Sequence, residues 1–351
     1  MFEKLKIIDL STVLAGPSVA SFFAELGCRV IKIENKKKPD VTRSWYFIGE
    51  QKSSVSAYFS SINYKKEYLK LDLSAPNDHA FFLQQLKTAD ILISNFKFGD
   101  EEKLNLTDAF LRSIQPNLII GKISGFGSES DRVAYDLILQ AETGFMSING
   151  TSESGPLKMP VALIDVLAAH HLKEGLLLAL IERMESGCAK TVEVSLYDAA
   201  ICSLVNQASN YLMSGIVPQR MGSLHPNIAP YGELFKTFDQ RTITFAVGNN
   251  EHFLKLCRYL GLELLPNDSR FSDNQQRVKN RISLFELIAG RVSLLDAEEI
   301  SIAMRKENVP YGIIKNIDEV LNSEWATKMI KSERIEETLT KRMSQIAFKW
   351  K

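Results

Sequence analysis

Short apolar runs alternate with longer amphipathic segments over the first part of the chain. The runs predict buried strands, and the apolar spacing of the segments between them predicts helices. Near-continuous apolar strands that alternate with helices are typical of a parallel sheet covered on both faces, so the pattern predicts an α/β fold. The predicted strands are residues 5–10, 28–34, 68–73, 89–96, 117–127 and 191–196, and the predicted helices are 17–26, 76–87, 107–114, 165–186 and 198–214.

The pattern changes in the second part of the chain. Two strand-like runs, GELFKTF and TITFAV, flank a short polar turn, and helical segments follow them. These elements predict a second, smaller α+β domain. The stretch before it is rich in Gly, Pro and Ser, which indicates a linker. The sequence therefore predicts a large domain at 1–205, a linker at 206–225 and a small domain at 226–300, with helices near 251–260 and 279–292.

The composition argues against several classes of function. The 351 residues are 45% hydrophobic and 24% charged, which is ordinary for globular domains. Lys and Arg number 42, as do Asp and Glu, so no overall field attracts nucleic acid or an anionic membrane. Local groups must therefore hold any anionic ligand. The four cysteines form no CxxC pair and the histidines show no metal spacing, so we expect neither a disulfide framework nor a metal.

The first residues, MFEKLKIIDL, lack the apolar core of a signal peptide. No apolar stretch approaches the roughly 18 residues of a membrane span. The cysteines are interpreted as buried thiols of a reducing compartment. Together these features predict a cytoplasmic protein with no membrane or nucleic-acid partner.

A single acid, Asp165, interrupts the apolar run VALIDVLAAHHLKEGLLLALIERM. One interpretation is a helix N-cap, whose carboxylate accepts backbone N–H groups of the first turn. The other is a catalytic nucleophile, because a helix start favours the ionised carboxylate and an idle charge within VALI would be costly. The pattern alone weighs the two interpretations equally, and they are compatible with each other.

Three polar segments follow predicted strands and are candidates for holding an anion. Residues 13–18, VLAGPS, place a helix start after the first strand, but the GxGxxG fingerprint of dinucleotide binding is absent. The basic run 36–38 and the segment 94–103 follow later strands, at the edge of the sheet where ligands gather in α/β folds. For each segment the plainer alternative, an empty loop or a solvated charged face, stays open.

Eight segments, in order from residue 5 to about 322, resemble the class III CoA-transferase family, of the formyl-CoA transferase and carnitine CoA-transferase type. They include IIDLSTVLAGPSVASFFAELGCRVIKIE, ISGFGSESDRVAYDLILQAETGFMSINGT and MPVALIDVLAAHHLKEGLLLALIERMESGCAKTVEVSLYDA. The resemblance implies a Rossmann-like large domain, acyl-CoA and a carboxylic acid as substrates, coenzyme A as the carried group, and no metal. In this family the acid that matches Asp165 is the nucleophile, which implies a mixed anhydride followed by an aspartyl-CoA thioester.

The same superfamily includes α-methylacyl-CoA racemases, which also resemble this chain at Asp165. They pair that acid with a His where this sequence has Tyr135, and an unperturbed Tyr with a pKa of about 10 is a poor proton shuttle near neutral pH. The transferases typically have Tyr there, so the resemblance favours a transferase. Asp136 matches a second acid near the family's active site and is expected to position substrate or steer the carboxylate. A surface-strand acid is the alternative interpretation.

The resemblance also implies a set of residues that contact CoA. The chain departs from the family at several of these places: Lys103 replaces a common Arg, Phe98 a common Pro, Ser74 a frequent Lys, and Leu14 a Gln of some members. These departures keep a non-catalytic CoA-binding paralogue open as an alternative. The implied CoA-binding residues are Val13, Leu14, Ala15, Lys36, Leu71, Asn95, Phe96, Lys103 and Leu104.

Members of this family form interlaced homodimers, which implies the same assembly for this chain. The resemblance further implies a closing linker at 301–314 and a return of 315–351 to the large domain. Family members commonly continue for some tens of residues beyond the part that matches 342–351, where this sequence ends.

Overall fold

The computed structural model describes residues 2–349, which divide into two compact units. The larger unit contains the chain up to Met146, then Lys158–Pro218, and the chain from Thr327 onward. The smaller unit contains Ser147–Leu157 and Gln219–Ala326.

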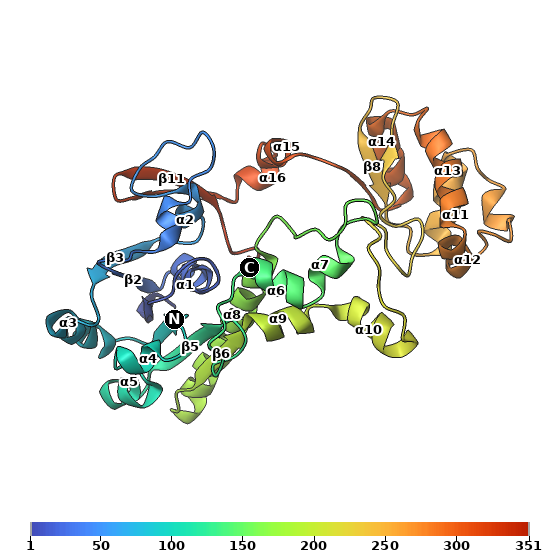
Figure 1. Cartoon of the computed structure of the whole chain (residues 1–351). Coiled ribbons are helices and arrows are strands. Elements are labelled where there is room, and N and C mark those ends of the chain that lie inside the picture. The colour runs from blue at the N-terminus through green and yellow to red at the C-terminus, as the bar shows by residue number, and fades with distance from the viewer. Residues whose placement is uncertain (1, 350–351) are drawn as a thin grey trace. The chain divides into compact units, whose positions relative to one another are not determined.

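A six-stranded parallel sheet forms the centre of the larger unit, with the strand order β3-β2-β1-β4-β5-β6 (Figure 1). The predicted α/β fold with a parallel sheet is confirmed. The order is that of Rossmann-type sheets, in which the chain builds outward in both directions from the middle. The strands are β1 (Lys6–Asp9), β2 (Arg29–Asn35), β3 (Lys66–Leu71), β4 (Ile91–Ser94), β5 (Ile119–Ser124) and β6 (Thr191–Ser195).

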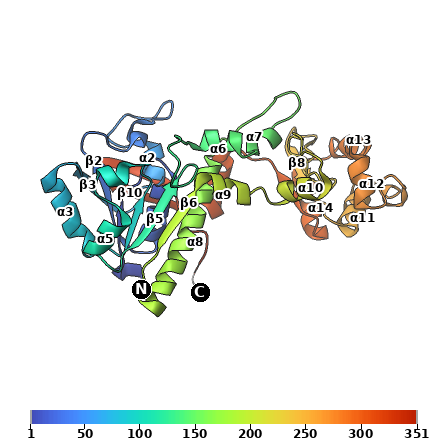
Figure 2. The same ribbon diagram turned by 60° about the horizontal axis from the view of Figure 1, so that its bottom comes forward.

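Helices cover both faces of this sheet, which explains why its strands are apolar at successive positions. Ile7 belongs to a core formed with α1 and α8, whereas its neighbour Ile8 belongs to a separate core formed with α3 and α5. Figure 2 shows α8 running beside β6. The helices of the larger unit are α1 (Ala15–Glu25), α2 (Ala57–Ser61), α3 (Pro76–Leu86), α4 (Asp100–Lys103), α5 (Asp108–Ile114), α6 (Asp136–Glu142), α8 (Leu163–Ser186), α9 (Leu196–Cys202) and α10 (Val205–Ser214), and α7 (Phe145–Ile148) spans the boundary.

The single helix predicted at 198–214 is wrong, because the structure has two helices, α9 and α10, in this stretch. The backbone of Val205, the first residue of α10, has a φ of 46°, in the left-handed region. A right-handed helix cannot continue through such a residue.

The C-terminal part of the chain returns to the larger unit as a hairpin of β10 (Ile330–Ile335) and β11 (Thr338–Met343). The hairpin packs against α2, and the two lie together in Figure 1. Arg342 of β11 forms a buried ion pair with Glu25 of α1, and just beyond the hairpin Ser344 Oγ donates a hydrogen bond to the same carboxylate at 2.6 Å. The return therefore begins at Thr327, later than the predicted residue 315.

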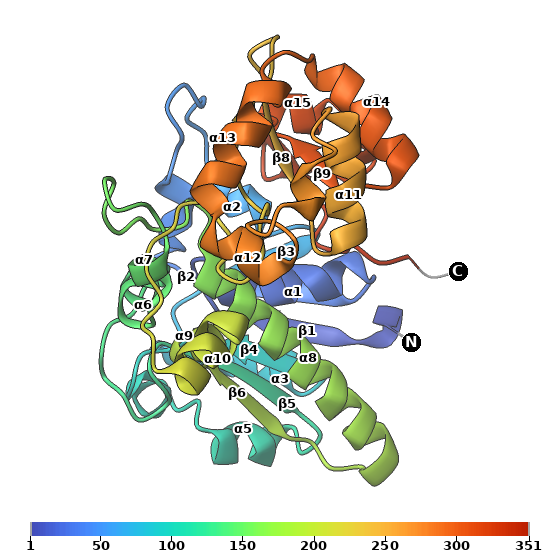
Figure 3. The ribbon, with the colours of Figure 1, turned by 90° about the vertical axis from the view of Figure 1, so that its right-hand side faces the viewer.

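The smaller unit is built on a three-stranded antiparallel sheet in the order β7-β8-β9, with its helices around it (Figure 3). The sequence predicted only two of these strands. The third strand, β9, and the helix α14 lie in the segment predicted as the linker 301–314, so that prediction is wrong. The elements are β7 (Phe235–Lys236), β8 (Thr242–Phe245), β9 (Tyr311–Ile313), α11 (Asn250–Tyr259), α12 (Asn274–Lys279), α13 (Arg281–Val292), α14 (Ala297–Glu307) and α15 (Ile317–Leu321), and α16 (Glu324–Thr327) ends at the boundary.

The cysteines do not all behave as the buried thiols that the sequence predicted. Cys28 and Cys257 are buried, whereas Cys188 and Cys202 are exposed. Among residues 2–349, no helix combines the length and apolarity that crossing a bilayer requires.

Candidate active site

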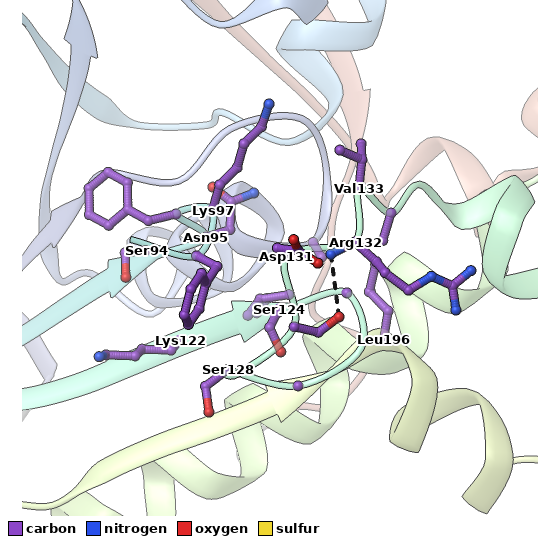
Figure 4. Close-up of a pocket in the computed structure, with 18 of the residues that line it drawn as sticks. Ser94, Asn95, Lys97, Lys122, Ser124, Ser128, Asp131, Arg132, Val133 and Leu196 are labelled. Carbon is purple, nitrogen blue, oxygen red and sulfur yellow. Dashed lines mark hydrogen bonds between the residues drawn. The ribbon is translucent and has the colours of Figure 1, made fainter. Parts of the chain in front are cut away.

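A pocket of about 400 Å³ lies at the carboxyl ends of β1, β4 and β5 in the larger unit. Its wall contains residues 12–15 after β1, 94–99 at the end of β4, and 122–125 at the end of β5. Figure 4 shows Ser94, Asn95 and Lys97 on one part of this wall and Ser124 of the neighbouring strand on another. The strand order reverses between β1 and β4, which is where ligands of open α/β sheets bind.

Asp165 lines this pocket from the first turn of α8. The N-cap position of the helix is Ala162, so the interpretation of Asp165 as an N-cap is wrong. The first turn is instead satisfied from outside the helix, because the Ile164 N–H donates a hydrogen bond to Asp136 Oδ1 at 2.8 Å. The Asp165 carboxylate therefore does not cap the helix.

Burial dominates the electrostatics of Asp165, which is only 9% exposed. Loss of solvation, with a smaller contribution from the negative charge of Asp136, raises the pKa of Asp165 to about 7. Among residues 2–349, no group donates a hydrogen bond to this carboxylate that would offset these effects. Burial and the charge of Asp136 thus oppose the ionised form that the helix start was expected to favour.

Tyr135 and Asp136 lie side by side at the start of α6 but have different surroundings. Tyr135 lines the pocket and is half exposed. Asp136 is buried, and in addition to the Ile164 N–H its carboxylate accepts a hydrogen bond from Gln140 Nε2 at 2.7 Å. The alternative interpretation of Asp136 as a surface-strand acid is wrong, because this residue joins α6 to the first turn of α8.

The structure brings together about half of the predicted CoA-binding residues. Val13, Leu14, Ala15, Asn95 and Phe96 all line the pocket. The other four lie outside its wall. Lys36 pairs with Asp78 at 2.7 Å, Lys103 pairs with Asp100 at 3.1 Å, Leu71 lies in the core beneath α3, and Leu104 packs against that same core.

Comparison with known proteins decides which family has this site. A model of CoA-transferase family III matches residues 2–351. The chain belongs to this family. Over 325 residues it is 35% identical to the succinate–glutarate CoA-transferase of Agrobacterium fabrum, covering 90% of this chain and 80% of that protein. It is 32% identical over 326 residues to the acetyl-CoA:oxalate CoA-transferase of Acetobacter aceti, covering 92% and 82%.

A solved structure agrees with this assignment. The crystal structure of a CAIB/BAIF family protein from Brucella suis has a TM-score of 0.83 with this chain at 31% identity, covering 99% of this chain and 92% of that one. The resemblance seen in the sequence is confirmed. As a family III CoA-transferase, the enzyme takes acyl-CoA thioesters and carboxylic acids as substrates.

Two cations that line the pocket of this CoA-transferase, Lys122 and Arg132, were not predicted from the sequence. Lys122 stands in the apolar strand β5 and pairs with Glu101 at 2.6 Å and Asp108 at 2.7 Å. Arg132 pairs with Glu142 at 2.7 Å. Lys122 could have been identified as a candidate, because it is a charged residue near the end of an apolar strand. Nothing in the sequence around Arg132 distinguishes it from an ordinary loop arginine.

Proposed function

We propose that this CoA-transferase moves CoA from an acyl-CoA to a free carboxylic acid with Asp165 as its nucleophile. The observation that carries the proposal is the state of the Asp165 carboxylate. It lines the pocket, is almost fully buried, and has a pKa of about 7. A carboxylate without solvent or hydrogen-bond donors around it is a better nucleophile than a solvated one.

The proposed exchange conserves atoms and electron pairs. An Asp165 carboxylate oxygen attacks the thioester carbonyl, the C–S bond breaks, and CoA leaves as a thiolate from a mixed anhydride. The thiolate then attacks the carbonyl of the aspartyl half, which expels the donor acid as a carboxylate and leaves an aspartyl-CoA thioester. The acceptor carboxylate repeats these steps in reverse, so Asp165 is regenerated and no net proton is consumed.

The reaction is tested by Asp165→Ala and Asp165→Asn, with Glu185→Gln as the matched control on an exposed part of the same helix. We expect the Asp165 variants to lose more than about 10³-fold in kcat and Glu185→Gln to keep normal activity. Hydroxylamine added during incubation with acyl-CoA should convert Asp165 to a hydroxamate that peptide mass spectrometry detects. Full activity of Asp165→Ala refutes the proposal.

Two alternatives give different results in the same experiment. A racemase would incorporate deuterium from D₂O at the α-carbon of the acyl group without needing an acceptor acid. A non-catalytic CoA-binding paralogue would show neither the hydroxamate nor the deuterium. We expect the hydroxamate alone.

We further propose that one substrate is a short dicarboxylic acid. The relatives from A. fabrum and A. aceti are named for succinate, glutarate and oxalate, and a human relative, 29% identical over 323 residues, is named succinyl-CoA:glutarate CoA-transferase. Lys97, Lys122 and Arg132 line the pocket. Lys122 and Arg132 already pair with carboxylates of the protein, so Lys97, for which residues 2–349 provide no ion-pair partner, is the cation suited to a second carboxylate. Succinyl-CoA as donor should transfer CoA to glutarate or oxalate faster than to butyrate, as read by mass spectrometry. A preference for butyrate would refute this part.

We propose that CoA extends past the pocket to Lys36 and Lys103. Both ammonium groups are exposed and are available to phosphate oxygens as point charges. Lys36→Gln should raise the KM for acyl-CoA several-fold and make it less sensitive to ionic strength, whereas Lys38→Gln, an exposed neighbour, should change neither. Equal effects of the two variants would contradict the assignment.

We also propose that the enzyme is a homodimer, interlaced as its resemblance to the family implies. Large apolar side chains gather at the end of α10 and just beyond it, where Leu212 is 78%, Met213 90% and Ile216 72% exposed. Adjacent apolar side chains this exposed mark an interaction surface. Light scattering should give the mass of two chains, and Leu212→Asp with Met213→Asp should reduce it to one, whereas Glu185→Gln should not. A wild-type mass of one chain would refute the dimer.

A further inference from the structure

The turn from β1 to α1 is the most strained part of the pocket wall. Val13 has a φ of 72°, in the left-handed region, and it lines the pocket together with its neighbours from residue 12 to residue 15. A β-branched residue rarely adopts this conformation, because its Cβ substituents crowd the backbone. Such a conformation persists only where the surrounding structure holds it.

Side chains from β1 itself, from β2 and from the end of β4 hold the backbone just before this residue. The Thr12 N–H donates to Asn95 Oδ1 at 2.9 Å, and Asn95 Nδ2 donates back to the Thr12 carbonyl at 2.9 Å. One residue earlier, the Ser11 N–H donates to Asp9 Oδ1 at 3.0 Å, and the Ser11 carbonyl accepts from Lys32 Nζ at 2.7 Å. Both the N–H groups and the carbonyls of residues 11 and 12 are therefore hydrogen-bonded. Asn95, which makes two of these bonds, also forms part of the pocket wall (Figure 4).

Asp40 accepts the hydrogen bond of the strained residue itself. The Val13 N–H donates to the Asp40 carboxylate, at 3.2 Å from Oδ2 and 3.4 Å from Oδ1. Asp40 Oδ1 also accepts from the Thr42 backbone at 3.1 Å and from the Thr42 hydroxyl at 2.7 Å. Lys32 Nζ lies 3.4 Å from Oδ2, and neither charged side chain is exposed.

The Asp40 carboxylate belongs to a network of buried charged side chains. Lys32 lies between Asp40 and Asp9, and Lys66 pairs with Asp9 at 2.8 Å. Although burial acts to raise it, the pKa of Asp9 is lowered, because the two ammonium groups favour its ionised form. The hydrogen bond from the Val13 N–H to Asp40 has an ion-paired side chain as its acceptor, and hydrogen bonds to charged groups are stronger than neutral ones.

We propose that Asp40 is a positioning residue for CoA transfer: by accepting the Val13 N–H it holds the strained turn of the pocket wall in the shape that binds CoA. The inference rests on the proposed function for its substrate, since it concerns the same pocket. Asp40 itself does not line the pocket, so its effect passes through the Val13 backbone.

A double-mutant cycle between Asp40→Ala and Val13→Gly tests this role. Glycine adopts positive φ without strain, so in the Val13→Gly background the turn no longer needs Asp40. We expect Asp40→Ala to raise the dissociation constant of CoA, measured by titration calorimetry, about ten-fold in the Val13 protein and less than about three-fold in the Val13→Gly background. An equal loss in both backgrounds, or no loss in either, overturns the proposal.

A control variant at a second buried carboxylate distinguishes this effect from a general loss of stability. Glu25 is also buried and paired with an arginine, Arg342, but it lies outside the pocket wall. Glu25→Gln should lower the melting temperature without changing the affinity for CoA, and Val13→Gly should not restore that temperature. If Asp40→Ala does not fold, Asp40→Asn is compared in the two backgrounds, and an effect that is the same in both overturns the proposal.

The measurement also separates this inference from the nucleophile assignment, because binding of CoA requires no turnover. If Asp165→Ala keeps full activity while the coupling between Asp40 and Val13 is present, the proposed nucleophile is wrong and the positioning role stands. If Asp165→Ala is inactive and the coupling is absent, the reverse holds.

Discussion

The most direct test of the electrostatics at Asp165 is the effect of Asp165→Asn on stability as a function of pH. The folded protein has an Asp165 pKa of about 7 in place of the ordinary 3.8. The folded state therefore retains a proton that the unfolded chain releases between about pH 4 and pH 7, so this group lowers the stability as the pH rises through that range. The shift corresponds to roughly 4 kcal/mol of destabilisation at pH 8 and to almost none at pH 4.

Asp165→Asn removes this ionisable group, so we expect the variant to be more stable than the parent at alkaline pH. In a unit of this size 1 kcal/mol corresponds to roughly 2–4 °C, so a gain of at least about 4 °C in melting temperature is expected at pH 8, even if half of the free energy is lost to imperfect amide contacts. At pH 4 to 5 the two melting temperatures should approach each other.

Differential scanning calorimetry at fixed protein concentration provides the measurement, since oligomers make the melting temperature depend on concentration. Glu185→Gln, on the exposed part of the same helix, should show no such pH-dependent gain. If Asp165→Asn is less stable than the parent at pH 8, or if the difference does not change with pH, the argument from burial is refuted.

Two further predictions concern packing and buried charge. A Cβ at Gly175 would lie 2.5 Å from Val192 Cγ1, so Gly175→Ala should cost roughly 1–3 kcal/mol by urea unfolding. Gly290→Ala should stabilise its helix instead, because among residues 2–349 a Cβ there would meet no atom within 4 Å beyond the backbone of its own helix. Arg43→Met should cost roughly 3–5 kcal/mol, because it leaves the buried Glu34 without its partner at 2.6 Å. Adding Glu34→Gln should restore most of that loss, and purely additive effects would contradict this prediction.

The larger unit was predictable because its helices cover both faces of the sheet. Adjacent residues such as Ile7 and Ile8 are both buried, so each strand appears in the sequence as a continuous apolar run between helices. The break between α9 and α10 was not predictable, since no Gly or Pro marks it. The strand β9 was missed because its three residues are too few to show a period.

The site was predictable in its centre and less so in its surroundings. Asp165 stood out because a charge within an apolar run needs a reason, and the family resemblance supplied one. The cause of its raised pKa did not stand out, because that depends on burial and on the nearness of Asp136, which only the fold determines. The wrong N-cap assignment has the same origin, since the group that satisfies the first turn of α8 comes from α6.

The engagement of Asp136 has a consequence for the fate of the α-hydrogen of the acyl group. Both oxygens of Asp136 already accept hydrogen bonds, one from the Ile164 backbone N–H and one from the Gln140 amide. Asp136 is therefore not free to remove a hydrogen from the substrate. Removing and returning a hydrogen on opposite faces of a carbon requires two such bases. With Asp136 engaged, the neighbouring pair Asp165 and Asp136 does not supply both, so a chiral acyl chain should leave this enzyme with the same handedness with which it entered.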